Sequence, residues 1–144
     1  MAYSIIEFAK SLEISKCKIQ SRPNLLFLCG GKIETIGPFQ SARDFFYRHL
    51  KGNNSALLGR IKLAEDISAW LQKDTAFPDL LQLENFLAYL ADFTFLFVES
   101  PGAIAELGAF AASDALRPRT VAILNNTTLG TDRSFIADGP VKRI

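Results

Sequence analysis

Residues 93–108 read FTFLFVESPGAIAELG, and this stretch is the main basis for the fold prediction. Its first six residues are an almost entirely apolar run, which is typical of a strand buried on both faces of a parallel sheet. Glu99 ends the run; Ser100 is a good N-cap and Pro101 suits the first helical position. Gly102 lacks the side chain that would block a ligand. The stretch therefore predicts a strand and then a helix whose free N–H groups face the sheet edge where ligands of α/β proteins bind.

Glu106 lies in the predicted helix, at the edge of its apolar stripe. The residues expected to be buried are Ile104, Leu107 and Ala111, with Ala103 and Phe110 at the margin. At about 100° per residue, Glu106 falls beside this stripe and not opposite to it. An acid in that position, one turn after Gly102, predicts a functional carboxylate. The alternative is an ordinary half-exposed helix acid.

Strands and helices alternate along the rest of the chain. The predicted strands are residues 25–29, 61–63, 93–98 and 120–124. The predicted helices are residues 3–13, 38–50, 79–91 and 101–113, with a further helical stretch through Trp70 and Leu71. This alternation predicts an α/β fold, a doubly wound (flavodoxin- or Rossmann-like) parallel sheet of about four to five strands flanked by helices. We expect one domain over residues 1–144, an N-terminal fragment of a longer protein.

The helix at 38–50 has an apolar side that we expect to face the core. The residues on this side are Phe39, Ala42, Phe45 and Phe46. Aromatic residues also suggest a different function for the chain, as an interaction protein. In that hypothesis Phe45, Phe46, Tyr47 and Tyr89 form an assembly surface and the acids are incidental.

Two further acids and a glycine pair are predicted at the same edge of the sheet as Glu106. Glu84 lies at the edge of an apolar helix stripe, as Glu106 does, and Glu99 follows a strand. Gly30 and Gly31 follow the strand at 25–29 and leave the backbone bare. We therefore expect Glu84, Glu99 and Glu106 to converge on one cleft as catalytic residues, with the glycines among its substrate-binding residues.

Carboxylates at a glycine-rich cleft suit the cleavage of a glycosidic bond. One carboxylate acts as nucleophile or electrostatic partner of the sugar, and another binds hydroxyls or moves a proton. Ser100, Pro101 and Gly102 are expected to bind a phosphate through the helix N-terminus. A nucleotide-sensing module without turnover stays open as an alternative, because phosphate binding needs the helix N-terminus and not Glu106.

Composition narrows the remaining possibilities. The chain has 144 residues, 49% hydrophobic and 22% charged, with a net charge of +1, so its charge does not argue for nucleic acid or a membrane surface. No apolar run approaches the roughly 20 residues that span a bilayer. Cys17 and Cys29 are too few for a disulfide framework, and no secretory signal is recognisable, which favours the cytoplasm. His49 is the single histidine, so a histidine-rich metal site is excluded and no metal is expected.

Four segments resemble a known family. They are Phe27-Leu-Cys-Gly-Gly31, Leu83-Glu84-Asn85, Ala91-Asp92 and the block from Val98 to Phe110. They are similar to the nucleoside 2-deoxyribosyltransferase-like fold, and more closely to its version in the toxic effectors of bacterial retrons. A later Ser-Phe-Ile…Gly-Pro-Val segment of those effectors corresponds here to residues 134–141.

The resemblance implies roles for the acids. Glu106 matches the catalytic glutamate that attacks or stabilises the anomeric carbon. Glu84 and Glu99 match acids, commonly aspartates in the transferases, that bind the sugar or base. The implied activity is that of an N-glycosidase toxin in an anti-phage, toxin–antitoxin-like retron system, hydrolysing the base–ribose bond of NAD or a related nucleotide. NAD or the nucleotide is then substrate, and no cofactor is expected.

The resemblance also implies partners. The family's effectors are held in check by a reverse transcriptase and its RNA-linked DNA. A homodimer is expected, since active sites in this fold family are often completed across a dimer. The effectors also carry a C-terminal, winged-helix-like DNA-binding half that is absent from these 144 residues.

Overall fold

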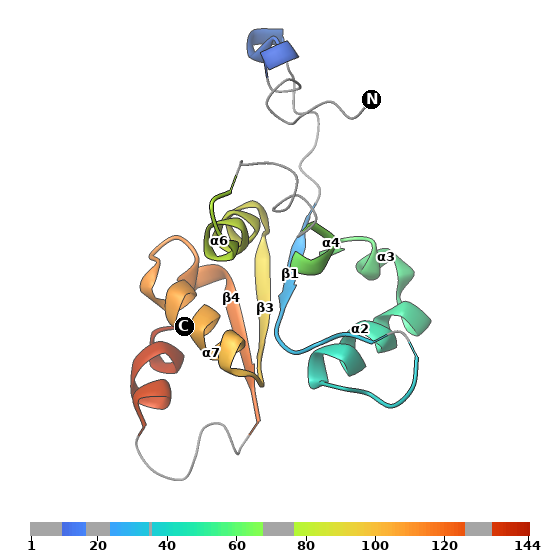
Figure 1. Ribbon diagram of the computed structural model, residues 1–144, viewed down its shortest axis with the longest axis vertical. Coiled ribbons are helices and arrows are strands. Elements are labelled where there is room, and N and C mark those ends of the chain that lie inside the picture. Colours follow the sequence, from blue (N-terminus) through green and yellow to red (C-terminus); the bar gives the residue numbers. More distant parts are fainter. Residues whose placement is uncertain (1–9, 17–23, 35, 68–76, 126–133) are drawn as a thin grey trace.

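The computed structural model describes residues 10–16, 24–34, 36–67, 77–125 and 134–144. Within them, four strands form one parallel sheet in the order β2-β1-β3-β4 (Figure 1). The strands are β1 (Leu26–Cys29), β2 (Ile61–Lys62), β3 (Phe93–Val98) and β4 (Thr120–Leu124). The prediction of a doubly wound parallel α/β fold is confirmed. Most of the helix predicted at 3–13, the stretch through Trp70 and Leu71, and Cys17 lie outside the described residues.

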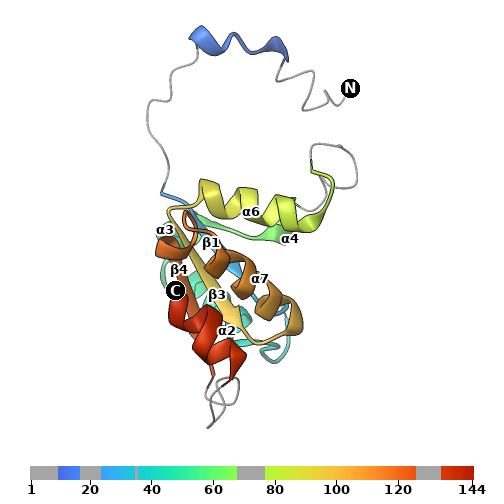
Figure 2. The same cartoon turned by 90° about the vertical axis from the view of Figure 1, so that its left-hand side faces the viewer.

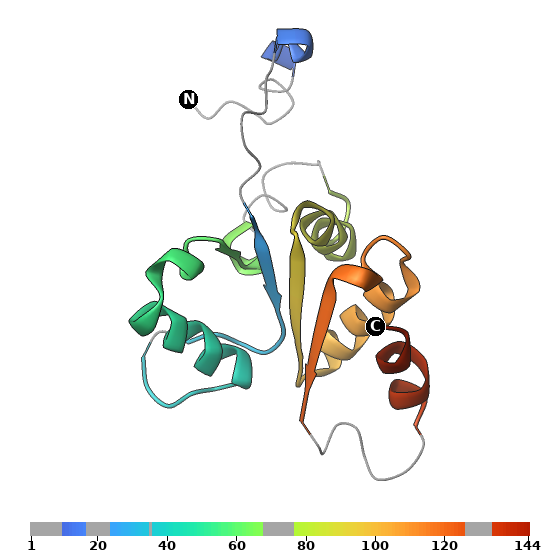
Figure 3. The ribbon, with the colours of Figure 1, turned by 180° about the vertical axis from the view of Figure 1, so that it is seen from behind.

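Helices cover both faces of the sheet (Figures 1 and 3). One face carries α2 (Ala42–Asn53) and α3 (Ser55–Leu58), and the other carries α4 (Ala64–Ile67), α6 (Leu80–Leu90) and α7 (Pro101–Ala112). The described part of the chain also contains the short 3₁₀-helices η1 (Ile14–Lys16) and η2 (Arg117–Arg119) and the π-helix η3 (Ala137–Val141). The C-terminal segment, red in Figure 2, lies beside α7. None of the helices in the described part of the chain combines the length and apolar character needed to cross a membrane.

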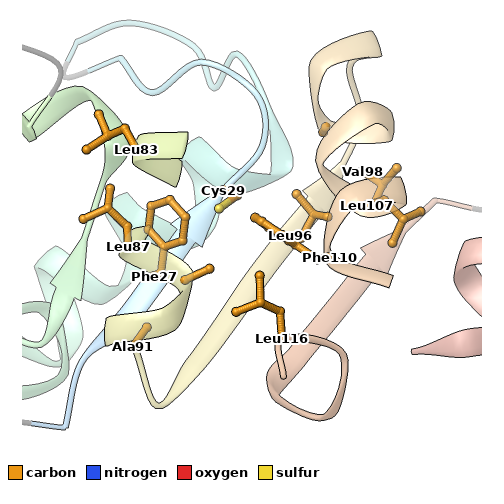
Figure 4. Packing of buried hydrophobic residues seen from close by; sticks show 12 residues of the cluster. Phe27, Cys29, Leu83, Leu87, Ala91, Leu96, Val98, Leu107, Phe110 and Leu116 are labelled. Atoms are coloured by element: carbon orange, nitrogen blue, oxygen red, sulfur yellow. The ribbon is translucent and has the colours of Figure 1, made fainter. Parts of the chain in front are cut away.

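Two hydrophobic clusters follow from the alternation of side chains along the strands. In β1, Phe27 and Cys29 belong to the cluster under α6 and α7, whereas Leu28 belongs to the cluster under α2. In β3, Leu96 packs in the first cluster and Phe97 in the second. Figure 4 shows the first cluster, in which side chains of α6 and α7 meet those of β1 and β3. The sheet is therefore buried on both faces, as the apolar run at 93–98 predicts.

The helix after β3 begins as the sequence predicts. Ser100 caps α7, its Oγ accepting a hydrogen bond from the Ala103 N–H at 3.2 Å. The expected burial of Ile104 is wrong, because 36% of its surface is exposed. Ile104 and Phe110 lie on opposite margins of the apolar stripe that is centred on Leu107. The helix is rotated so that Phe110 is buried instead of Ile104, because the larger Phe110 side chain gains more free energy from burial. The same rotation turns Glu106, which lies on the Phe110 side, towards the sheet.

The inward face of α2 differs from the prediction. Its buried residues are Arg43, Asp44 and Leu50. Phe39 precedes the helix and is exposed, as are Ala42 and Phe45. Two charged residues replace the predicted apolar face because they bind backbone groups of the loop that follows β1. The Asp44 carboxylate accepts hydrogen bonds from the backbone N–H groups of Glu34 and Gln40.

The four aromatic residues suggested as an assembly surface do not form one surface. Phe46 packs on the sheet, with its ring centroid 5.5 Å from that of Phe97. Phe45 and Tyr89 are both about half exposed, but they lie on α2 and α6, which cover opposite faces of the sheet. An assembly role based on these four residues together is therefore not supported.

Candidate active site

A cavity of about 200 Å³ opens at the carboxyl end of β1. It is lined by Cys29, Gly30, Arg43, Ala64, Glu65, Leu80, Glu84 and Glu106, from β1 and the helices α2, α4, α6 and α7. In the sheet order, β1 lies beside β3, and the chain leaves these two strands in opposite directions. Ligands of doubly wound sheets bind at this kind of switch point, outside the carboxyl ends of the strands. The structure therefore brings Glu84, Glu106 and Gly30 together at the place where a ligand site is expected.

Glu84 and Glu106 form a pair of carboxyl groups on one side of the cavity. Burial raises the pKa of Glu106 to about 7, and the negative charge of Glu84 and a hydrogen bond with it act in the same direction. Burial also raises the pKa of Glu84. Two half-buried carboxyls in contact favour a state with one proton between them, since two negative charges at this range repel each other. The pair can therefore supply one ionised carboxylate and one acid near neutral pH.

One oxygen of Glu106 is available to a ligand. Its Oε2 atom is buried and has no hydrogen-bond partner among the residues that the structure describes. A buried oxygen without a partner is costly unless a water or a ligand satisfies it. Glu106 Oε2 is therefore placed to accept a hydrogen bond from a molecule in the cavity or to form a covalent bond to it.

An ion pair forms another wall of the cavity. Arg43 donates to both carboxylate oxygens of Glu65, at 2.6 and 2.9 Å, in a bidentate arrangement. The Arg43 side chain is only 3% exposed, whereas that of Glu65 is 55% exposed. Burial acts to raise the pKa of Glu65, but hydrogen bonds, chiefly from Arg43, outweigh it and leave this pKa lowered. Glu65 is therefore a carboxylate at neutral pH, unlike the Glu84–Glu106 pair.

The two glycines after β1 have different roles. Gly30 lines the cavity with φ +130°, and a Cβ there would lie 2.6 Å from the Phe97 carbonyl oxygen, so only glycine fits. Gly31 does not line the cavity. A Cβ at Gly31 would lie 2.8 Å from the Ser41 Cβ and 2.9 Å from Glu99 Oε1, so this glycine permits close packing of the loop against Glu99.

Glu99 is not brought to the cavity. Its carboxylate accepts hydrogen bonds from the backbone N–H groups of Ala42 at 2.8 Å and Arg43 at 3.2 Å. These are free N–H groups of the first turn of α2, where a negative charge is favourable. The carboxylate therefore ties the end of β3 to the start of α2. Of the three acids predicted to converge, the structure brings together two, and the third carboxylate at the cavity is Glu65.

Ser100, Pro101 and Gly102 lie at the N-terminus of α7, as predicted, but none of them lines the cavity. Ser100 Oγ caps the helix. Among the described residues, a Cβ on Gly102 would meet only Ser100 Oγ, at 3.9 Å, so this part of the chain leaves the helix start open above Gly102. Phosphate binding by these three residues stays a prediction.

Sequence reasoning missed Arg43 and Glu65. Arg43 lies within a helix whose apolar residues suggested another inward face. Glu65 follows β2 closely, so the rule that drew attention to Glu99, an acid after a strand, could also have found it. Cys29 is a buried free cysteine, and burial together with the nearby Glu106 charge raises the pKa of its thiol, which keeps the thiol protonated. Among the described residues, His, Cys, Asp and Glu side chains form no cluster of three that could hold a metal ion.

We predict that Glu99→Gln destabilises the fold. The amide keeps one acceptor oxygen but places an NH₂ group against the N–H groups of α2, and we expect a loss of about 1–2 kcal/mol in the free energy of unfolding. Denaturant titration measures the change. If Glu99→Gln has the stability of the wild type but has lost enzymatic activity, Glu99 has the catalytic role that its position in the sequence suggests.

Comparison with known proteins places the chain in a family. Residues 39–144 match the family of the STM3845 retron effector protein. The chain is 34% identical over 119 residues to the "Retron Ec86 putative ribosyltransferase/DNA-binding protein" of Escherichia coli. This alignment covers 81% of this chain and 36% of that protein. It is 33% identical over 143 residues to the "Retron Ec73 putative ribosyltransferase/DNA-binding protein" of Escherichia coli, covering 95% of this chain and 43% of that protein. The chain thus spans less than half the length of these curated relatives. With the match over residues 39–144, we conclude that this chain belongs to the family of STM3845 retron effector proteins.

Proposed function

We propose that the cavity is the active site of an N-glycosidase that hydrolyses the base–ribose bond of NAD or a related nucleotide. The observation that carries this proposal is the pair of Glu84 and Glu106 carboxyls at the switch point of the sheet. The names of the two relatives both contain the word ribosyltransferase, which supports chemistry at the anomeric carbon.

In the proposed reaction the C1′–N bond breaks and the base leaves with its electron pair. Positive charge develops on C1′ and the ring oxygen, and the ionised Glu106 carboxylate stabilises this charge or bonds to C1′. Below about pH 7 the proton of the pair lies on Glu106, so this role belongs to the protein in which Glu106 has ionised, and the Glu84 carboxylate binds a sugar hydroxyl. Water then adds its oxygen to C1′ and displaces the Glu106 oxygen where that bond has formed. The proton of the water passes to a carboxylate of the pair, or to the departed base where that base leaves as an anion. A second base in place of water would give transfer.

The size of the cavity favours the sugar as its occupant. At about 200 Å³ it is smaller than the roughly 300–1,000 Å³ of typical ligand sites. We propose that a ribose enters it and that the base and phosphates lie towards the open side. Ser100, Pro101 and Gly102 are proposed to bind a phosphate through the start of α7. NAD or the nucleotide is then the substrate, and the proposed reaction requires no cofactor.

In the cell we propose a toxin that acts against phage and is held in check by the retron reverse transcriptase and its RNA-linked DNA. Membership of the retron effector family supports this arrangement. We further propose that the protein works in the cytoplasm, where its substrate is, as a homodimer.

The proposal is tested by incubating the protein with NAD and a panel of nucleotides and separating the products by chromatography. We expect free nicotinamide or nucleobase to accumulate in proportion to protein and time, and not with heat-denatured protein. If no base is released from any compound, and a ligand is recovered intact with measurable affinity, the protein is a nucleotide sensor and the glycosidase proposal is wrong.

The acid pair also predicts how stability depends on pH. The pKa of Glu106 is about 7 in the folded protein, against an ordinary value of 4.5, so the folded state holds more protons than the unfolded state between these values. The free energy of unfolding should therefore decrease as pH rises from about 4.5 to about 7 and then level off with respect to this group. Denaturant titrations across this range measure the slope. In Glu106→Gln the decrease should be smaller, and an equal slope in both proteins would contradict the prediction.

A further inference from the structure

The Arg43–Glu65 ion pair lies in the same cavity as the acid pair but has no part in the proposed reaction. Four charged or titratable side chains converge there from four helices: Arg43 from α2, Glu65 from α4, Glu84 from α6 and Glu106 from α7. The charge of Arg43 is opposite to that of any ionised carboxylate in the cavity. The carboxylate with which Arg43 pairs therefore affects the protonation of all three acids.

The hydrogen bonds of Arg43 identify Glu65 as its carboxylate partner. Its Nη1 donates to Glu65 Oε1 and to the carbonyl oxygens of Gly31 at 3.1 Å and Gly30 at 3.4 Å. Its Nη2 donates to Glu65 Oε2 and to the Leu28 carbonyl oxygen at 2.7 Å. These contacts direct both terminal nitrogens towards Glu65 and the end of β1. The Nε atom is buried without a partner among the described residues.

We propose that Glu65 is a positioning residue, which holds the Arg43 guanidinium against the end of β1 and so prevents it from pairing with the Glu84 and Glu106 carboxyls. A guanidinium that paired with either carboxyl would fix that group as a carboxylate, because charge-assisted hydrogen bonds favour the ionised form. The positive charge would also lower the pKa of the other carboxyl, so the pair would lose its shared proton at a lower pH. The role of Glu65 in catalysis rests on the proposed function, whereas its effect on the charge of the cavity does not.

The charges around Glu106 agree with this role. The groups that face it are Glu84, Arg43, Glu65 and the Cys29 thiol. The positive charge of Arg43 lowers the pKa of Glu106 and of Glu84, and the negative charge of Glu65 raises both. Removing the charge of Glu65 should therefore shift the titration of the acid pair in one direction, to lower pH.

The test compares Glu65→Gln with Asp66→Asn. Both changes remove one negative charge from α4, but Asp66 does not line the cavity. We measure base release from the best substrate between pH 4 and 9, and the free energy of unfolding over the same range. In Glu65→Gln the midpoints of both pH profiles should lie lower by about half a pH unit or more. In Asp66→Asn they should stay at the wild-type pH.

Glu65→Asp provides the second variant. It keeps the negative charge, so its midpoint should lie closer to the wild-type value than that of Glu65→Gln. Midpoints that coincide in Glu65→Gln and the wild type would overturn the inference. If the stability profile shifts but no variant or wild type releases base, the proposed function fails and the role of Glu65 in setting the charge of the cavity stands. If base is released and neither midpoint moves, only the inference about Glu65 fails.

Discussion

Glu106→Gln is expected to lower the rate of base release by about 10²- to 10⁴-fold, the range found for groups that act directly on the reacting atoms. The amide has nearly the shape of the carboxylate, but it cannot carry the negative charge that stabilises C1′ or form a bond to it. The protein should stay folded, because the replacement removes a half-buried group whose ionisation burial disfavours. Chromatographic measurement of free base, together with a thermal unfolding curve, tests both expectations.

Glu84→Gln is the matched variant on the other member of the pair. It removes the negative charge that raises the pKa of Glu106, so the pH at which Glu106 ionises should fall. We expect reduced but measurable turnover, with the acid side of the pH profile moved to lower pH. If Glu106→Gln releases base at the wild-type rate, Glu106 has no role in the proposed reaction.

Arg43→Met is expected to have the largest effect on stability, a loss of about 3–5 kcal/mol in the free energy of unfolding. Arg43 is 2% exposed and donates to the carbonyl oxygens of Leu28, Gly30 and Gly31. A methionine fills a similar volume but leaves these carbonyl groups with fewer partners in a buried place, and it removes the partner of Glu65. Denaturant titration measures the loss.

Lys51→Met is the control for this change. Lys51 lies in the last turn of the same helix and is exposed, so its replacement should alter stability by no more than about 0.5 kcal/mol. Equal losses in the two variants would show that the hydrogen bonds of Arg43 do not hold the end of β1 in place.

Much of the candidate site could be predicted from local patterns. The period of the helix after β3 placed Glu106 beside the buried stripe, and Ser100 identified the first turn of that helix. The apolar run at 93–98 identified the central strand with the bounds that the structure gives. Each of these inferences depends on residues a few positions apart, where backbone geometry alone fixes which side chains share a face.

The partners of Glu99 and Arg43 could not be predicted in this way. Glu99 follows a strand and lies near Glu106 in the sequence, yet its carboxylate binds the start of α2, 57 and 56 residues away. Arg43 lies on a helix with several aromatic residues, yet it is buried because the carbonyl groups at the end of β1 need donors. Both outcomes depend on which helix lies over which strand end.

Local patterns sufficed to predict the parallel α/β sheet and the half-buried position of Glu106, because the apolar runs of buried strands and the 3.6-residue period of helices involve residues close together in the chain. That Glu65, and not Glu99, joins Glu84 and Glu106 at the cavity depended on long-range packing. The helices α2, α4, α6 and α7 converge on one strand end from distant parts of the chain, and no local pattern specifies which of their side chains meet there.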